Sequence, residues 1–233
     1  MTSESIVEQL RCVLGRWGGP PSPARTVAYR PATWRPWCIS HTAASAIVDQ
    51  FAGAETDPTG QITRADLVAL SSTIGDADDT DGHVRLFVAT MLWGSGTSNG
   101  RGPRFTGSAL DDGHLVPSLI ETRSLILDGD PARAYAAFRS RGVGPAFFTK
   151  WLWAAGLDRD LEVTPLILDA RVWASLRALG WDSREAAGSK RWAQRYLAYL
   201  RAMARWSDEL SPAVTTPEQL EQVLFKWAGS DAT

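Results

Sequence analysis

The sequence feature that most constrains the fold is the segment Arg141-Gly142-Val143-Gly144-Pro145, which separates two stretches of helical composition. Residues Pro131 to Phe138 are rich in alanine and arginine, whereas the glycines that follow are too close together to continue a helix. Two glycines around one apolar residue permit positive φ angles and let an anion approach the peptide N–H groups. Pro145 suits the first position of a new helix. The segment therefore predicts a tight hairpin between two helices, which is either an anion-binding turn or an ordinary glycine turn.

One acidic residue follows this hairpin at the start of another expected helix. Asp169 lies 19 residues after Lys150, between the connection Pro165 to Leu168 and the apolar-periodic segment Arg171 to Leu179. An aspartate in this position accepts hydrogen bonds from backbone N–H groups as an N-cap. By itself, Asp169 therefore requires no function beyond capping.

Together, these segments resemble the helix-hairpin-helix superfamily of DNA glycosylases. Its members carry a Gly-Val/Ile-Gly hairpin and, further on, a catalytic aspartate in a Val-Asp-x-x-Val/Met-Trp-like element; here these are Gly142 to Gly144 and Leu168 to Trp173. A third segment, Val84 to Asn99, looks like the earlier helix and small polar loop of the family. The resemblance covers roughly residues 82 to 180 and is closest to the 8-oxoguanine glycosylase branch.

The resemblance implies an enzyme that flips a damaged or modified base out of double-stranded DNA and excises it. It implies that Asp169 is the essential acid and that Gly142, Val143, Gly144 and Thr149 bind the DNA. An oxidised purine such as 8-oxoguanine is the expected target, and another modified base is the alternative. Two further alternatives are a helix-hairpin-helix DNA-binding module without catalysis and an α-helical interaction protein whose acidic first half binds a protein partner.

One position departs from the family pattern. The 8-oxoguanine branch usually has a catalytic lysine two residues after the second hairpin glycine, where this chain has Ala146. Lys150 lies four residues further on, which is about one helical turn or roughly 6 Å along the same face. Lys150 is therefore either a relocated nucleophile with lyase activity or an ordinary lysine that is solvated or contacts a phosphate. In the second case, Asp169 alone stabilises the oxocarbenium charge and orients a water.

The chain contains 11 tryptophans, and flat side chains recover part of the cost of base flipping by stacking on the extruded base. We expect the base pocket to be formed by Trp93, at the end of the helix before the polar loop, and by Phe147 and Trp151 on the second hairpin helix. Core packing is the expected role of four further tryptophans: Trp153, Trp173, Trp192 and Trp206.

The loop between Gly94 and Arg104 is rich in glycine and polar residues. Such a loop suits insertion into a duplex, with Asn99 replacing the extruded base and Arg101 or Arg104 holding the partner strand or its phosphates. A plain surface loop is the alternative interpretation.

Charge is distributed unevenly, although the net charge of the chain is −2. Residues 131–205 contain 13 Lys and Arg against 6 Asp and Glu, whereas residues 1–130 contain 10 against 15. A helix expected from Gly188 to Ala204 accounts for much of this surplus, through Lys190, Arg191, Arg195, Arg201 and the adjoining Arg205. These residues form either a solvated helix face or contacts to DNA phosphates.

Helix signals dominate the remaining sequence, so we expect an all-α protein with a helix-hairpin-helix DNA glycosylase fold and without an N-terminal β lobe. Gly15 to Pro36 is expected to be an irregular arm. The 233 residues would form a single domain, with two lobes of about 1–130 and 131–233 on either side of an active-site cleft.

No apolar run approaches the roughly 18 residues needed to cross a bilayer, so we expect a cytoplasmic monomer without membrane contact. Cys12 and Cys38 lack a paired metal-ligand spacing, and the 3 histidines form no ligand pattern. We therefore expect neither a metal nor a cofactor.

Overall fold

The structure of the chain is a computed structural model that describes residues 3–17, 26–53, 58–75, 78–95, 100–157 and 159–228. These residues form thirteen helices and one two-stranded antiparallel sheet, which confirms the all-α prediction. The strands are β1 (Val27–Tyr29) and β2 (Gly60–Ile62). The helices are α1 (Ser3–Trp17), α2 (Pro31–Cys38), α3 (Thr42–Gln50), α4 (Arg64–Thr73), α5 (Thr80–Ser95), α6 (Gly102–Leu110), α7 (Leu115–Leu127), α8 (Pro131–Ala137), α9 (Pro145–Ala155), α10 (Ala170–Ala178), α11 (Ser183–Ala187), α12 (Trp192–Leu210) and α13 (Pro217–Trp227).

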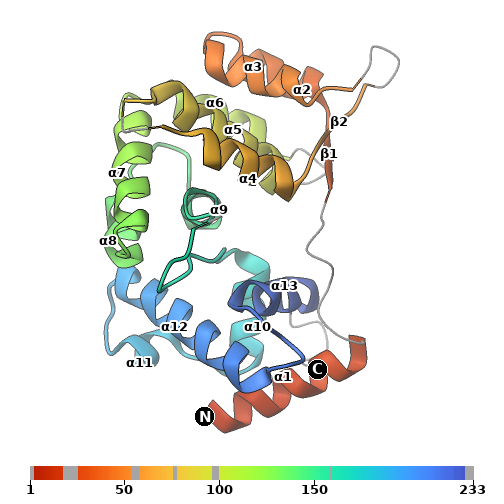
Figure 1. Ribbon diagram of the computed structural model, residues 1–233, viewed down its shortest axis with the longest axis vertical. Helices are drawn as coiled ribbons and strands as arrows, with labels where there is room; N and C mark the ends of the chain where they lie inside the picture. The colour runs from red at the N-terminus through yellow and green to blue at the C-terminus, as the bar shows by residue number, and fades with distance from the viewer. Residues whose placement is uncertain are drawn as a thin grey trace.

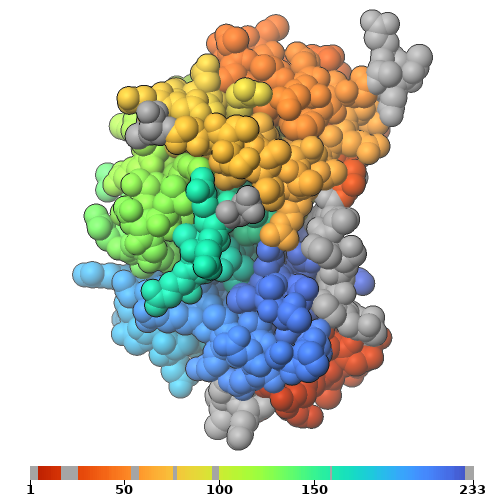
Figure 2. All heavy atoms as spheres, in the orientation of Figure 1, coloured from red at the N-terminus to blue at the C-terminus, as the bar shows by residue number. Residues whose placement is uncertain are grey.

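The helices gather at two ends of the molecule, with α9 between them (Figure 1). Helices α2 to α6 and the sheet form one end, and α10 to α13 form the other. Helix α1 packs against α12, so the start of the chain lies beside its C-terminal helices; the space-filling view shows the same neighbourhood (Figure 2). The lobe boundary expected near residue 130 stays a prediction. In the structure, α1 lies with the C-terminal helices rather than with the helices that follow it in the chain.

Local signals explain where several helices begin. Thr63 and Asp66 form a reciprocal capping box at the start of α4, in which each side chain accepts a hydrogen bond from the other residue's backbone N–H. Asp130 caps α8 by accepting a hydrogen bond from the N–H of Arg133. Prolines occupy the first turns of α8, α9 and α13, where their missing N–H costs no intrahelical hydrogen bond.

The central helix α9 is buried from Phe148 to Ala155, as expected for an element surrounded by α4, α5, α7 and α8. Trp151 is fully buried, and its indole N–H donates to Thr122 Oγ1 at 2.9 Å. Arg123, also buried, donates to the carbonyls of Ala155 and Ser71 at 3.0 and 3.1 Å. This arginine ties the C-terminal turn of α9 to α4, so the helix is fixed at its far end as well as along its sides.

Two expected boundaries were wrong. The arm expected over Gly15 to Pro36 contains the end of α1, strand β1 and most of α2, while residues 18–25 lie outside the described part of the chain. A strand of three residues is too short to show an alternating pattern, and β1 is stabilised by pairing with the distant β2. The helix expected from Gly188 begins only at Trp192, because Gly188 adopts φ +56° as the C-cap of α11.

Candidate active site

The predicted hairpin is present between α8 and α9, but its two glycines differ. Gly142 has φ +82°, a conformation that L side chains rarely adopt, whereas Gly144 has φ −81° and ψ 176°, which any residue can adopt. Val143 between them is buried and anchors the hairpin to the core. The N–H of Arg141 donates to the Asp112 carboxylate at 2.6 Å, which holds the hairpin against the turn before α7. Only Gly142 is therefore required by the backbone.

Gly144 has no conformational or packing reason to be glycine. A Cβ atom added there would meet no other described atom within 4 Å, and the residue is exposed. It is the N-cap of α9, and no side chain caps this end of the helix. Pro145 has no N–H group, and the N–H groups of Phe147 and Phe148 donate to the Gly144 carbonyl at 2.9 and 3.0 Å. The start of α9 therefore offers an anion the N–H of Ala146 and the positive end of the helix dipole.

Asp169 is the N-cap of α10, as predicted. Its Oδ1 atom accepts hydrogen bonds from the N–H groups of Arg171 and Val172, at 2.9 and 3.1 Å. Its other oxygen, Oδ2, lies 3.7 Å from the Nζ atom of Lys150. The side chain of Asp169 is only 12% exposed. One carboxylate oxygen therefore holds the helix start while the other faces the lysine.

Lys150 reaches back along α9 by one turn. Its Nζ atom donates to the carbonyl oxygen of Ala146 at 2.8 Å, and its side chain is 10% exposed. Helical side chains lean toward the N-terminus of their helix, which brings the ammonium of residue 150 to the level of residue 146. Gly94 of α5 makes room for the stem, because a Cβ added there would lie 2.5 Å from Lys150 Cδ.

The chain before Asp169 is held by hydrogen bonds from buried side chains. Thr149 Oγ1 donates to the carbonyl of Pro145 at 2.8 Å and accepts from the N–H of Leu168 at 3.1 Å. Two tyrosines of α12 donate to the preceding carbonyls, Tyr196 to Leu166 and Tyr199 to Ile167. Thr149, which we expected at the DNA, is instead fully buried and connects the two helices that carry Lys150 and Asp169.

The expected base-pocket residues lie in different environments. Trp93 is partly buried and stacks on Trp153, with ring centroids 4.9 Å apart and planes 20° apart. Phe147 is also partly buried, and its ring centroid is 5.6 Å from Lys150 Nζ. Trp151 lies in the core instead, so a base would reach its ring only if α9 moved. Of the three, Phe147 lies beside the Lys150 ammonium, and Trp93 directly precedes Gly94, the residue that packs against the Lys150 stem.

Two glutamates of α13 border this region, and sequence reasoning missed both. Glu218 accepts hydrogen bonds from Trp153 Nε1 and from Arg64 of α4, which joins α4, α9 and α13. Glu221 is buried; burial raises the pKa of its carboxyl group well above the usual range, and the nearby Asp169 and Glu218 act in the same direction. No motif spacing identifies either residue, because both belong to an ordinary amphipathic helix.

The residues expected to enter the duplex gap are only partly described. Asn99 lies outside the described residues. Arg101 is exposed at the N-cap of α6, and Arg104 is exposed in the first turn of that helix rather than in a loop. The arginines therefore project from a helix start.

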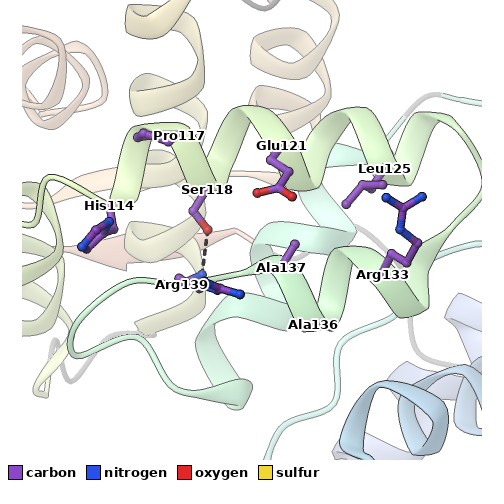
Figure 3. A pocket seen from close by; sticks show the side chains of 9 residues that line it. All are labelled: His114, Pro117, Ser118, Glu121, Leu125, Arg133, Ala136, Ala137 and Arg139. Carbon is purple, nitrogen blue, oxygen red and sulfur yellow. Dashed lines mark hydrogen bonds between the residues drawn. The ribbon is translucent and has the colours of Figure 1, made fainter.

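An open groove of about 500 Å³ between α7 and α8 contains neither Asp169 nor Lys150. Figure 3 shows Glu121 of α7 opposite Ala137 of α8 in this groove, with the N–H of Arg139 bonded to Ser118 Oγ at 2.7 Å. Its polar lining also includes Arg133. The groove is separate from the candidate active site.

The described residues contain no helix that is long and apolar enough to cross a membrane. They also contain no cluster of three or more His, Cys, Asp or Glu side chains suited to hold a metal ion.

The sequence was compared with protein families, curated proteins and solved structures. No curated protein and no solved structure matched the chain. Residues 21–225 match the protein family described as "Putative 8-oxoguanine DNA glycosylase OGG-like protein", and this range includes the hairpin, Lys150 and Asp169. Because the match spans most of its length, the chain belongs to the OGG-like 8-oxoguanine DNA glycosylase family.

Proposed function

We propose that the protein excises an oxidised purine from double-stranded DNA, with Asp169 as the essential acid and Lys150 as the nucleophile. The observation that carries this proposal is the position of Lys150 Nζ, 2.8 Å from the Ala146 carbonyl and 3.7 Å from Asp169 Oδ2. The Lys150 side chain thus runs back by one turn, and its ammonium lies beside the backbone of residue 146, where related enzymes attach their lysine.

The arrangement supports a lyase mechanism. As a neutral amine, Lys150 attacks the sugar C1′; the new N–C1′ bond forms as the glycosidic bond breaks, and the base departs with the electron pair and takes up a proton. Asp169 Oδ2 faces the same space, where its charge stabilises the oxocarbenium character of the transition state. The C1′–O4′ bond of this adduct then breaks, and a proton passes from the nitrogen to O4′, which gives a Schiff base. Elimination from the Schiff base removes a C2′ proton and breaks the C3′–O bond, which releases the 3′ phosphate and cleaves the strand.

The open start of α9 supports DNA binding at the hairpin. Gly142, Val143 and Gly144 would hold a backbone phosphate through main-chain N–H groups, because the helix end is uncapped and exposed. The absence of a side chain at residue 144, which the fold itself does not require, fits close approach of a phosphate. Arg101 and Arg104 would contact the partner strand or its phosphates.

The flipped base would lie beside Trp93 and Phe147, the two partly buried aromatic residues near Lys150. Trp93 is supported from behind by Trp153, so its ring offers a preformed stacking surface. The family supports 8-oxoguanine as the first base to test.

The test uses end-labelled duplexes with one 8-oxoguanine, treated with borohydride or with heat and alkali. We expect a borohydride-trapped adduct in the wild type that is lost in Lys150→Gln, since glutamine retains most of the stem but not the amine. Gly94→Ala should reduce trapping without removing a reactive group, because the added methyl displaces the lysine stem. Arg201→Gln, an exposed change on α12, is the control and should trap normally.

Each other outcome selects an alternative. Alkali-dependent nicking without trapping would show an enzyme in which Asp169 acts with a water and Lys150 has another role. No nicking would exclude 8-oxoguanine, and the same assay would then be run on other modified bases. A protein that binds these duplexes but cleaves none would be a DNA-binding module without catalysis.

A further inference from the structure

The start of α12 carries an aromatic and basic surface that the proposed chemistry does not use. Trp192 is 51% exposed, and the guanidinium carbon of Arg195 lies 3.5 Å from the centroid of its ring. Trp173 of α10 packs beside them, 6.0 Å from Trp192 between ring centroids. Large side chains with this exposure are uncommon among the described residues, and the core role expected for Trp192 is therefore wrong.

Arg195 holds the Trp192 ring in a defined orientation. The arginine is buried, and its Nε atom donates to Ser183 Oγ of α11 at 2.8 Å. A guanidinium this close covers one face of the indole, so the exposed surface lies on the opposite face and the ring edges. This also corrects the expectation that Arg195 belongs to a solvated basic face. Its role is to support the tryptophan.

The surroundings of Trp192 are basic. Lys190 and Arg191 precede it directly and are exposed, and residues 188–205 contain five basic residues and no acidic one. The nearest preceding acidic residues are Asp182 and Glu185 on α11, and the Asp182 carboxylate caps that helix. An exposed flat ring next to two cations has the chemistry that recognises a nucleic acid strand, in which apolar sugars alternate with phosphates.

The surface is also close to the candidate active site. Trp173 follows Asp169 by one helical turn, since its N–H donates to the Asp169 carbonyl at 2.9 Å. One turn of α10 and the contact between the two tryptophans together place Trp192 on the order of 15 Å from Asp169, or about four nucleotides along one strand. This distance is within reach of a DNA strand that is bound at Asp169.

We propose that Trp192, Lys190 and Arg191 bind the DNA strand that flanks the excised base. The exposed face of Trp192 packs against a sugar, and the two cations pair with neighbouring phosphates. This inference rests on the proposed function in that both require double-stranded DNA. It adds a second binding site, which contributes affinity and does not take part in the reaction.

The first experiment measures binding by fluorescence anisotropy, with a labelled duplex of about 25 base pairs that contains a tetrahydrofuran abasic-site analogue. We expect Trp192→Ala to raise Kd about 5- to 10-fold, whereas Trp192→Phe, which keeps a ring over Arg195, stays within about 2-fold. Lys190→Gln and Arg191→Gln should each reduce the slope of log Kd against log salt by about 1. Arg201→Gln, an exposed basic residue further along α12, should change neither quantity.

A second measurement locates the contact. When the flank on either side of the analogue is shortened in steps to about two base pairs, the effect of Trp192→Ala should disappear on one side only. The single-turnover excision rate at saturating enzyme should be unchanged in Trp192→Ala. If Trp192→Ala still raised Kd after either flank had been shortened, Trp192 would not contact the flanking DNA, and the proposal would be overturned.

Folding and the proposed function are separated by the same set of variants. Lys190→Gln and Arg191→Gln alter exposed side chains, so they report on DNA even if Trp192→Ala lowers the melting temperature. If every variant binds the duplex with the Kd of wild type, the second site is overturned and the proposed function stays intact. If the wild type binds the duplex without excising any base, only the proposed function fails, and the Trp192 effect on Kd still decides this inference. If the wild type binds no duplex, both fail.

Discussion

Two neighbouring helix starts in this protein are built in opposite ways. Helix α9 begins at Gly144, which is exposed and provides no side chain to cap the helix. Helix α10 begins at Asp169, whose Oδ1 atom satisfies two of its N–H groups. The first start is open to an anion from outside, whereas the second already contains its anion and positions it beside Lys150.

A helix N-terminus can thus serve two purposes in one protein. At α9 the open end, including the N–H of Ala146, would bind a phosphate, and a side chain at residue 144 would obstruct its approach. At α10 the same groups orient a carboxylate, so the side chain must be present and short enough to cap. Thr149 connects the two starts through hydrogen bonds to Pro145 and Leu168.

The largest expected effect comes from removing the charge at the second start. Asp169→Asn should slow base excision by at least about 100-fold, because asparagine can cap α10 but cannot stabilise the positive transition state. Asp182→Asn is the matched control, since Asp182 caps α11 through the N–H groups of Arg184 and Glu185. Single-turnover rates and melting temperatures would be compared, and a normal rate in Asp169→Asn would remove this residue from the mechanism.

The next effect separates the two glycines of the first start. Gly144→Ala should weaken duplex binding about 10-fold, because the methyl group occupies the space of a bound phosphate, with stability changed by less than about 1 kcal/mol. Gly142→Ala should instead cost about 1–2 kcal/mol of stability, because its φ is +82°. Gly15→Ala on the exposed side of α1 should leave binding unchanged. Fluorescence anisotropy measures duplex binding, and urea unfolding measures stability. A Kd of Gly144→Ala equal to that of wild type would contradict the expected role of this glycine.

A smaller effect is expected when the connection between the starts is broken. Thr149→Val keeps the shape of the side chain but leaves the Leu168 N–H without its acceptor, at a cost of about 1–2 kcal/mol. Asp169 follows Leu168 directly, so excision should also slow, by less than in Asp169→Asn. Urea unfolding and single-turnover rates measure both, and an unchanged rate despite the lost stability would show that Asp169 is positioned by α10 alone.

The smallest effect concerns Glu221, whose pKa is raised by burial next to Asp169 and Glu218. The folded state keeps this carboxyl protonated at a pH where the unfolded chain, with its usual value of 4.5, has already lost the proton. The free energy of unfolding therefore falls as the pH rises above that value. Glu221→Gln cannot ionise, so relative to wild type it should gain stability between pH 5 and pH 8. Urea unfolding of both proteins at the two pH values measures this. A difference in the free energy of unfolding between Glu221→Gln and wild type that is the same at both pH values would contradict the prediction.

Prediction from sequence succeeded where the signals were local. The hairpin between α8 and α9, the proline at the start of α9 and the cap at Asp169 each depend on a few consecutive residues. It failed where a distant partner decided the structure. Strand β1 exists through pairing with β2, and the buried place of Trp151 and the exposed place of Trp192 depend on which helices surround them.

The candidate site shows the same division. The sequence singled out Asp169 and Lys150, but left open whether Lys150 is a relocated nucleophile or an ordinary lysine that is solvated or contacts a phosphate. The structure brings the two charged groups to 3.7 Å, because Gly94 of α5 leaves space for the lysine stem and the Lys150 ammonium extends back to Ala146.

The amino-acid sequence alone was sufficient to place the turn of the hairpin and the start of α9 at Pro145, since turn and cap preferences act within about four residues. The contacts between side chains of α5, α9 and α13 became known only from the tertiary structure. They place Gly94, Glu218 and Glu221 around the candidate site. The physical reason is that packing and burial depend on segments far apart in the chain, and no local preference specifies them.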